Sequence, residues 1–304
     1  MPLSSSRHLL PSQGVQLQLH QSGAPGSPRI LLLHGFPEAA FIWQPLMTAL
    51  ADEAHVLAPD QRGYGASDAP DGSAAYRART LVADIAELIT STGGPVDLLV
   101  AHDWGGAVAW NLAAACPQLL RRLLIINSPH PALFLQALRD DPAQQAASAY
   151  MNMLCEADAA ARLSADDFTP MWQFFEAMSP AASGDDGWLT PAMRAQYRAV
   201  WARGLDPQLN WYRASPLRPP LGATDAIHQL SLPASMTHVA VPVRVLWGEA
   251  DRALPPSLLD GLAEHVPDLR ITRVPDASHW LIHEQPALVL ATVREELAAL
   301  RAGR

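Results

Sequence analysis

The sequence Val100-Ala101-His102-Asp103-Trp104-Gly105-Gly106 joins an apolar, strand-like stretch, 96–101, to a stretch of helical character, 107–116. A strand that passes through a tight turn straight into a helix exposes its turn residue at the end of the strand, in the arrangement called a nucleophile elbow. The usual pattern at such a turn is G-x-S-x-G, whereas this chain has A-H-D-W-G. Asp103 is therefore the candidate nucleophile.

A carboxylate nucleophile predicts a different chemistry from a serine hydroxyl. Serine forms an acyl-enzyme from an ester or amide, whereas an aspartate opens an electrophilic sp³ carbon and itself becomes the acyl half of the ester. Epoxides and alkyl halides are such substrates. Taken alone, the heptapeptide is also consistent with Asp103 as a helix N-cap, so the rest of the chain has to distinguish the two roles.

Composition narrows the class of protein. The chain has 304 residues, is 49% hydrophobic and carries a formal net charge of −9. It is long enough for one large core or for a core with an inserted lid, and we expect one compact catalytic unit. Without a cluster of Lys and Arg, nucleic acid is not an expected partner. The first residues lack the apolar run of a secretory signal and no apolar stretch is long enough to span a membrane, so we expect a cytoplasmic protein. Cys116 and Cys155 give no disulfide framework.

Strand and helix patterns alternate along both ends of the chain. A period of two over 15–20 predicts an edge strand, and short apolar runs predict further strands at 29–33, 55–58, 96–101, 123–127, 243–247 and 269–274. Helical spacing separates them at 39–51, 79–90, 107–116 and 284–300. This alternation predicts an α/β fold with a mostly parallel sheet and helices on both of its faces. A ligand site is then expected at the carboxyl ends of the strands.

The strand signal disappears between residues 129 and 236. Ala, Met, Trp and Pro on helical spacing replace it, so this segment is predicted to be a helical cap inserted into the core domain. The core is accordingly expected to comprise residues 1–128 and 237–304. We find no internal repeat and no low-complexity tract.

Three more motifs follow predicted strands. In His34-Gly35-Phe36-Pro37-Glu38, the Phe36 N–H is expected to join the Trp104 N–H as an oxyanion hole. Asp251 follows the strand at 243–247 and is the expected acid that orients a histidine, with Glu249 as the alternative. His279, in Ser278-His279-Trp280, is the expected base. The chain order nucleophile, acid, histidine is the one that the elbow motif requires.

At this point the sequence resembles the epoxide hydrolases of the α/β-hydrolase fold and their haloalkane dehalogenase relatives, over nearly the whole chain. The likeness is carried by HGFPE at 34–38, DQRGYGASD at 60–68, HDWGG at 102–106, GEAD at 248–251 and SHW at 278–280. The family usually has GH where this chain has Ser278-His279. The resemblance implies an α/β-hydrolase fold and two cap tyrosines that hydrogen-bond to the epoxide oxygen. Asn210-Trp211-Tyr212-Arg213 assigns Tyr212, and Ala149-Tyr150-Met151 suggests Tyr150, with Tyr197 in reserve.

The resemblance implies a two-step hydration of a small apolar epoxide, in which Asp103 forms an ester and His279, held by Asp251, activates the water that hydrolyses it. We expect no metal or organic cofactor and a monomer or homodimer. Substrate contacts are expected from the side chains of His34, Pro37, Trp104, Trp172 and Trp280. Two alternatives stay open: a haloalkane dehalogenase that uses the same triad, with the Trp104 indole holding the halide, and a hydrolase-like binding protein without turnover.

Overall fold

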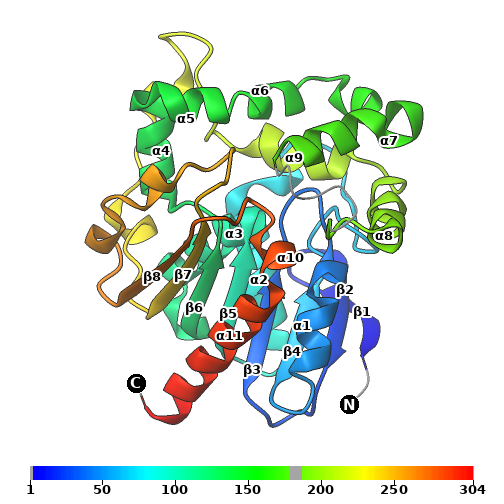
Figure 1. The fold of residues 1–304 in the computed structure, drawn as a ribbon, viewed down its shortest axis with the longest axis vertical. Coiled ribbons are helices and arrows are strands. Elements are labelled where there is room, and N and C mark those ends of the chain that lie inside the picture. The colour runs from blue at the N-terminus through cyan, green and yellow to red at the C-terminus, as the bar shows by residue number, and fades with distance from the viewer. Residues whose placement is uncertain (1–2, 179–186, 304) are drawn as a thin grey trace.

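A computed structural model describes residues 3–178 and 187–303, and its centre is an eight-stranded sheet (Figure 1). The strand order is β1-β2-β4-β3-β5-β6-β7-β8. The first two strands, β1 (Ser4–Leu10) and β2 (Val15–Ser22), pair antiparallel, and β2 is antiparallel to β4 (His55–Pro59). The remaining neighbours are parallel: β3 (Arg29–Leu33), β5 (Val96–His102), β6 (Leu120–Ile126), β7 (Val243–Gly248) and β8 (Leu269–Val274). The predicted α/β architecture is confirmed.

The central strands are apolar on both faces because helices cover both. In β5, Leu99 and Ala101 face one core, whereas Leu98 and Val100 face the other, and all four are fully buried. The first core is completed by α2 (Ala78–Ser91) and α3 (Asp103–Ala115). The second is completed by α1 (Gln44–Ala49), α10 (Leu281–Glu284) and α11 (Pro286–Arg301). Successive residues of a strand point to opposite faces, so a doubly covered sheet requires a continuous apolar run.

The helices between β6 and β7 form a layer across one end of the sheet, at the top of Figure 1. They are α4 (Pro131–Asp140), α5 (Pro142–Ala147), α6 (Tyr150–Leu154), α7 (Ala159–Ala177), α8 (Pro191–Trp201) and α9 (Asp206–Ala214). The expected helical insert is thus present. None of the helices in the described ranges is long and apolar enough to cross a membrane.

Three local features differ from the sequence expectation. Strand β1 was not expected, because most of its side chains are exposed and it has no apolar alternation. The helix expected at 107–116 begins earlier, at Asp103, directly after β5. The helix expected at 284–300 is preceded by the short α10 and starts at Pro286, since a proline suits the first turn of a helix but disfavours helical backbone in the residue before it.

Candidate active site

Asp103 lies in a strained turn at the carboxyl end of β5. Its φ is +50°, in the left-handed region that few residues other than glycine adopt. The turn is tight because two glycines follow. A Cβ on Gly105 would stand 2.6 Å from the carbonyl oxygens of Leu33 and His34, and one on Gly106 would stand 2.3 Å from the Ser128 Cβ. Close packing of α3 on the ends of β3 and β6 therefore holds Asp103 in a conformation that it would not adopt freely.

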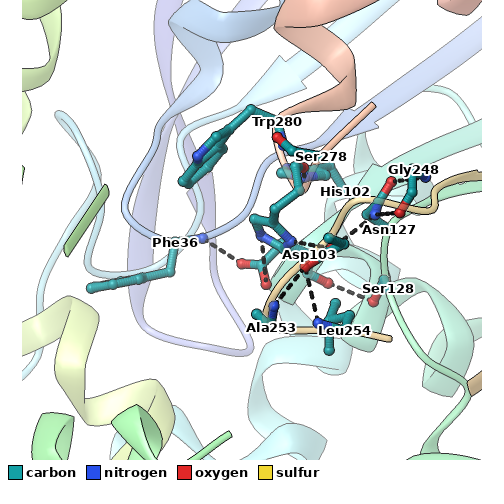
Figure 2. A network of polar contacts seen from close by, with 12 residues as sticks. Phe36, His102, Asp103, Asn127, Ser128, Gly248, Ala253, Leu254, Ser278 and Trp280 are labelled. Carbon is teal, nitrogen blue, oxygen red and sulfur yellow. Dashed lines mark hydrogen bonds and ion pairs between the residues drawn. The ribbon is translucent and has the colours of Figure 1, made fainter. Parts of the chain in front are cut away.

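The loop after β3 presents a hydrogen-bond donor to this aspartate. The Phe36 N–H donates to Asp103 Oδ1 at 2.7 Å (Figure 2). Gly35 makes the approach possible, because a Cβ there would meet the Asp103 side chain at 2.4 Å. Among the described residues, the Trp104 N–H, the second donor expected, makes no hydrogen bond to the Asp103 carboxylate. Since Oδ1 is occupied by Phe36, Oδ2 is the oxygen left to react.

His279 connects Asp103 to Asp251. Its Nδ1 is 2.8 Å from Asp251 Oδ2, and its Nε2 is 3.6 Å from Asp103 Oδ2, which is beyond hydrogen-bond distance. The other Asp251 oxygen accepts the N–H groups of Ala253 and Leu254, both at 2.9 Å (Figure 2). Asp251 is thus held as an acceptor for the His279 ring, which fixes the ring's orientation. Glu249, the alternative acid, instead pairs with Arg273 at 3.2 Å near the surface.

The carboxylates around His279 control its charge. Burial lowers the pKa of an imidazole, but the negative charges of Asp251, Asp103 and Glu38 outweigh this effect and raise the pKa of His279 to about 9. At neutral pH the imidazole is therefore charged as long as the Asp103 carboxylate keeps its negative charge. A general base must be neutral, so the loss of a nearby negative charge is what would prepare His279 for that role.

Two residues that the sequence analysis did not single out support this arrangement from the end of β6. Asn127 donates from Nδ2 to Asp251 Oδ2 at 2.8 Å and accepts the Gly248 N–H at 3.0 Å. The Ser128 hydroxyl donates to the Asp103 carbonyl at 2.7 Å. Both follow a strand directly, which is the signal that would have identified them.

A buried polar cluster lies behind the histidine. The Glu38 carboxylate is fully buried, with Tyr197 Oη at 2.6 Å, His283 Nε2 at 2.8 Å and His102 Nδ1 at 3.2 Å. Burial alone would raise the pKa of Glu38, but the hydrogen bonds from His102 and His283 and the charges of these histidines hold it well below its usual range. His102 in turn donates from Nε2 to the His279 carbonyl at 2.8 Å. The cluster therefore ties a cap residue to the loop that carries the catalytic-base candidate.

Both tyrosines expected from the cap face Asp103. Tyr150 on α6 and Tyr212 on α9 line, together with Asp103 and Trp104, a cavity of about 360 Å³. Their ring centroids are 6.3 Å apart. Burial and the Asp103 charge raise the pKa of Tyr150, and burial, Tyr150 and Asp103 raise that of Tyr212, so both remain hydrogen-bond donors. Tyr197 lines neither this cavity nor the smaller one described next, because its hydroxyl is engaged by Glu38.

A second, much smaller space lies on the His279 side of Asp103. It has a volume of about 10 Å³ and is bordered by Phe36, Ala253, His279 and Trp280 in addition to Asp103 and the two tyrosines. A space of this size has room for about one water molecule. Asp103 thus stands between a large apolar cavity and a pocket of water-molecule size.

The other residues expected to contact substrate lie in different places. Trp104 lines the large cavity and Trp280 the small one. His34, Pro37 and Trp172 line neither space. His34 is buried and accepts the Gln61 N–H, the Pro37 carbonyl accepts the Trp201 indole N–H, and Trp172 packs on Trp201 with ring centroids 4.4 Å apart. These three side chains are buried and border neither space, so they serve the packing of core and cap.

Comparison with known proteins agrees with this fold. A family model described as the alpha/beta hydrolase fold matches residues 28–286. The AB hydrolase superfamily protein YfhM of Bacillus subtilis (strain 168) is 34% identical over 290 residues, which cover 94% of this chain and 96% of that protein. Epoxide hydrolase 4 of Mus musculus is 31% identical over 291 residues, which cover 93% of this chain and 77% of that protein.

Solved structures give the same result. The crystal structure of Bacillus megaterium epoxide hydrolase in complex with an inhibitor has a TM-score of 0.87 and 29% identity, covering 96% of this chain and 100% of that one. An epoxide hydrolase from metagenomes of hot environments has a TM-score of 0.85 and 32% identity, covering 98% of this chain and 99% of that one. The chain belongs to the α/β-hydrolase fold family. Within it, the chain is related to epoxide hydrolases over nearly its full length.

Proposed function

We propose that this protein is an epoxide hydrolase that converts an epoxide to a vicinal diol through an ester of Asp103. One observation carries the proposal: Asp103, Tyr150 and Tyr212 line the same cavity, so that one space holds a carboxylate and two hydroxyl donors. Opening an epoxide leaves an alkoxide, a poor leaving group, so hydrogen-bond donors are needed where its charge develops. The relative from Bacillus megaterium has also been solved with its diol product, (R)-3-[1]naphthyloxy-propane-1,2-diol.

In the first step, Asp103 Oδ2 attacks one epoxide carbon. The bond between that carbon and the epoxide oxygen breaks, and its electron pair stays on the oxygen, which accepts hydrogen bonds from Tyr150 and Tyr212. One of the two tyrosines passes its proton to this oxygen, which becomes the first hydroxyl of the diol, and the tyrosine recovers a proton from the solvent. Asp103 becomes a neutral ester, so its contribution to the raised pKa of His279 disappears and the imidazole can release its proton.

In the second step, neutral His279 takes a proton from water and the water oxygen attacks the Asp103 carboxyl carbon. Negative charge develops on Oδ1, where the Phe36 N–H donates. The bond between the carboxyl carbon and the ester oxygen then breaks, and the departing oxygen takes the proton from His279 to become the second hydroxyl. The Asp103 carboxyl group, which now holds one oxygen from water, passes its remaining proton to His279 and is again a carboxylate beside a charged imidazole. The diol carries an oxygen from the enzyme.

Trapping the ester tests this proposal directly. In His279→Ala the nucleophile remains but the base is lost, so we expect the ester to accumulate. Intact-protein mass spectrometry after mixing with styrene oxide should show one added substrate mass, on the peptide that contains Asp103. The matched control is the double variant Asp103→Asn with His279→Ala, which should gain no mass. Equal labelling of both variants, or no diol formed from any epoxide by the wild type, would refute the proposal.

A further inference from the structure

The two spaces that meet at Asp103 are very unequal. The large cavity has about 360 Å³ and the small one about 10 Å³. The small space adjoins His279, the expected base, and has room for about one water molecule. If the hydrolytic water occupies it, an epoxide at Asp103 has space for a large substituent in one direction only.

The large cavity is lined along several turns of α3. Trp104, Ala107 and Asn111 line it from α3 together with Asp103. These positions share one face of the helix, and the eight steps from Asp103 to Asn111 span about 12 Å at 1.5 Å per step. Further lining comes from the segment after α9 and from the 3-10 region before β7, including Leu217, Leu232 and Met236. A chain or ring system attached to the epoxide therefore has a path along α3.

The walls of this cavity are almost uncharged. Of the described residues that line it, Asp103 is the only one with a charged side chain. A second carboxylate on the substrate would lose its hydration without meeting a Lys or Arg, and it would be repelled by Asp103. An apolar substituent instead gains free energy from each methylene that it buries.

Building on the proposed epoxide hydration, we propose that the substrate is an uncharged epoxide with one extended apolar substituent, its other ring carbon bearing hydrogen. The extended group lies along α3 toward Asn111. The unsubstituted side of the ring faces the small space beside His279 that the water needs.

Isomeric and homologous epoxides test this specificity on the wild-type protein. For 1,2-epoxybutane, 1,2-epoxyhexane and 1,2-epoxydecane, kcat/KM should rise by up to about fourfold per methylene. 5,6-Epoxydecane has the same formula as 1,2-epoxydecane but a butyl group on each carbon, and its kcat/KM should be at least about tenfold lower. The anion of 9,10-epoxydecanoic acid, which is also terminal but carries a carboxylate, should likewise be at least about tenfold poorer than 1,2-epoxydecane.

A pair of variants on α3 tests whether the extended substituent lies along this helix. Asn111→Phe adds an aromatic ring inside the cavity, so the ratio of kcat/KM for 1,2-epoxydecane over 1,2-epoxybutane should fall by about tenfold or more. Ala115→Phe places the same ring on an exposed position of the same helix, outside the cavity, and should leave this ratio unchanged. Equal effects of the two variants on the ratio would contradict the path along α3.

The results distinguish the proposed substrate class from epoxide hydration itself. Turnover of all these epoxides without preference for the terminal, uncharged, longer ones would overturn the substrate class and leave epoxide hydration intact. Turnover of none of them, together with no labelling of Asp103 in His279→Ala, would overturn both. Preference for 1,2-epoxydecane over both of its ten-carbon counterparts is the result expected.

Discussion

Replacing Asp103 by Asn imitates the neutral ester and should lower the pKa of His279. The two charged groups are 3.6 Å apart, so Coulomb's law gives an interaction of about 1 kcal/mol at a dielectric constant of 80 and about 5 kcal/mol at 20. Since 1.36 kcal/mol corresponds to one pH unit, the pKa of His279 should fall from about 9 by about 1 to 3 pH units. Such a fall brings the imidazole into the range where it acts as a base near neutral pH.

The measurement is an NMR titration of the histidine ring signals. The chain has 11 histidines, so the His279 signal is assigned as the one missing from His279→Gln. Asp251→Asn is the comparison, because the Asp251 carboxylate also raises the pKa of His279 and lies closer, at 2.8 Å. A pKa of His279 that is the same in the wild type and in Asp103→Asn would refute the idea that ester formation prepares the base.

Two further predictions concern the cap and the core. Tyr150→Phe and Tyr212→Phe should each slow ester formation from styrene oxide by about one to three decades, measured by stopped-flow, and the double variant should be nearly inactive. Release of bromide from 1-bromobutane needs no such donors, so full epoxide turnover by the double variant, or wild-type bromide release far faster than epoxide hydration, would favour the dehalogenase alternative. In the core, Arg62 makes a buried two-point ion pair with Asp84, at 2.6 and 2.7 Å. Asp84→Ala should lower the free energy of unfolding in urea by about 3 to 5 kcal/mol, and Asp84→Leu with Arg62→Met should recover most of it, because an unpaired buried charge costs more than an absent pair. A loss as large in the double variant would contradict this account.

Much of the fold was predictable because the central strands are apolar on both faces. The strand limits at β3 and β8 agree with the sequence expectation residue for residue. Strand β1 was not predicted, because it pairs with β2 through the backbone and this pairing requires no apolar side chain. Sequence periodicity reports burial, so an exposed edge strand leaves little signal.

The site was predictable to the extent that strand ends define it. Asp103, Asp251 and His279 each follow a strand, and the structure brings them together as expected. Site residues in the cap are harder to predict from the sequence, because the position of a residue along a helical insert does not say which helix crosses above Asp103. The structure places Tyr150 on the cavity and Tyr197 beside Glu38, a distinction that depends on the path of the chain through α7 and α8.

This division between core and cap has a consequence for what each part controls. The loops after β3, β5, β6, β7 and β8 supply Phe36, Asp103, Asn127, Asp251 and His279, and these five strands are consecutive neighbours in one rigid sheet. The groups that we propose to make and hydrolyse the ester are thus held at the strand ends of a single sheet. The cap supplies the tyrosines and much of the large cavity's wall. Changes to the cap wall away from Tyr150 and Tyr212 should therefore alter which epoxide is accepted, whereas changes at the strand ends should stop the reaction for every substrate.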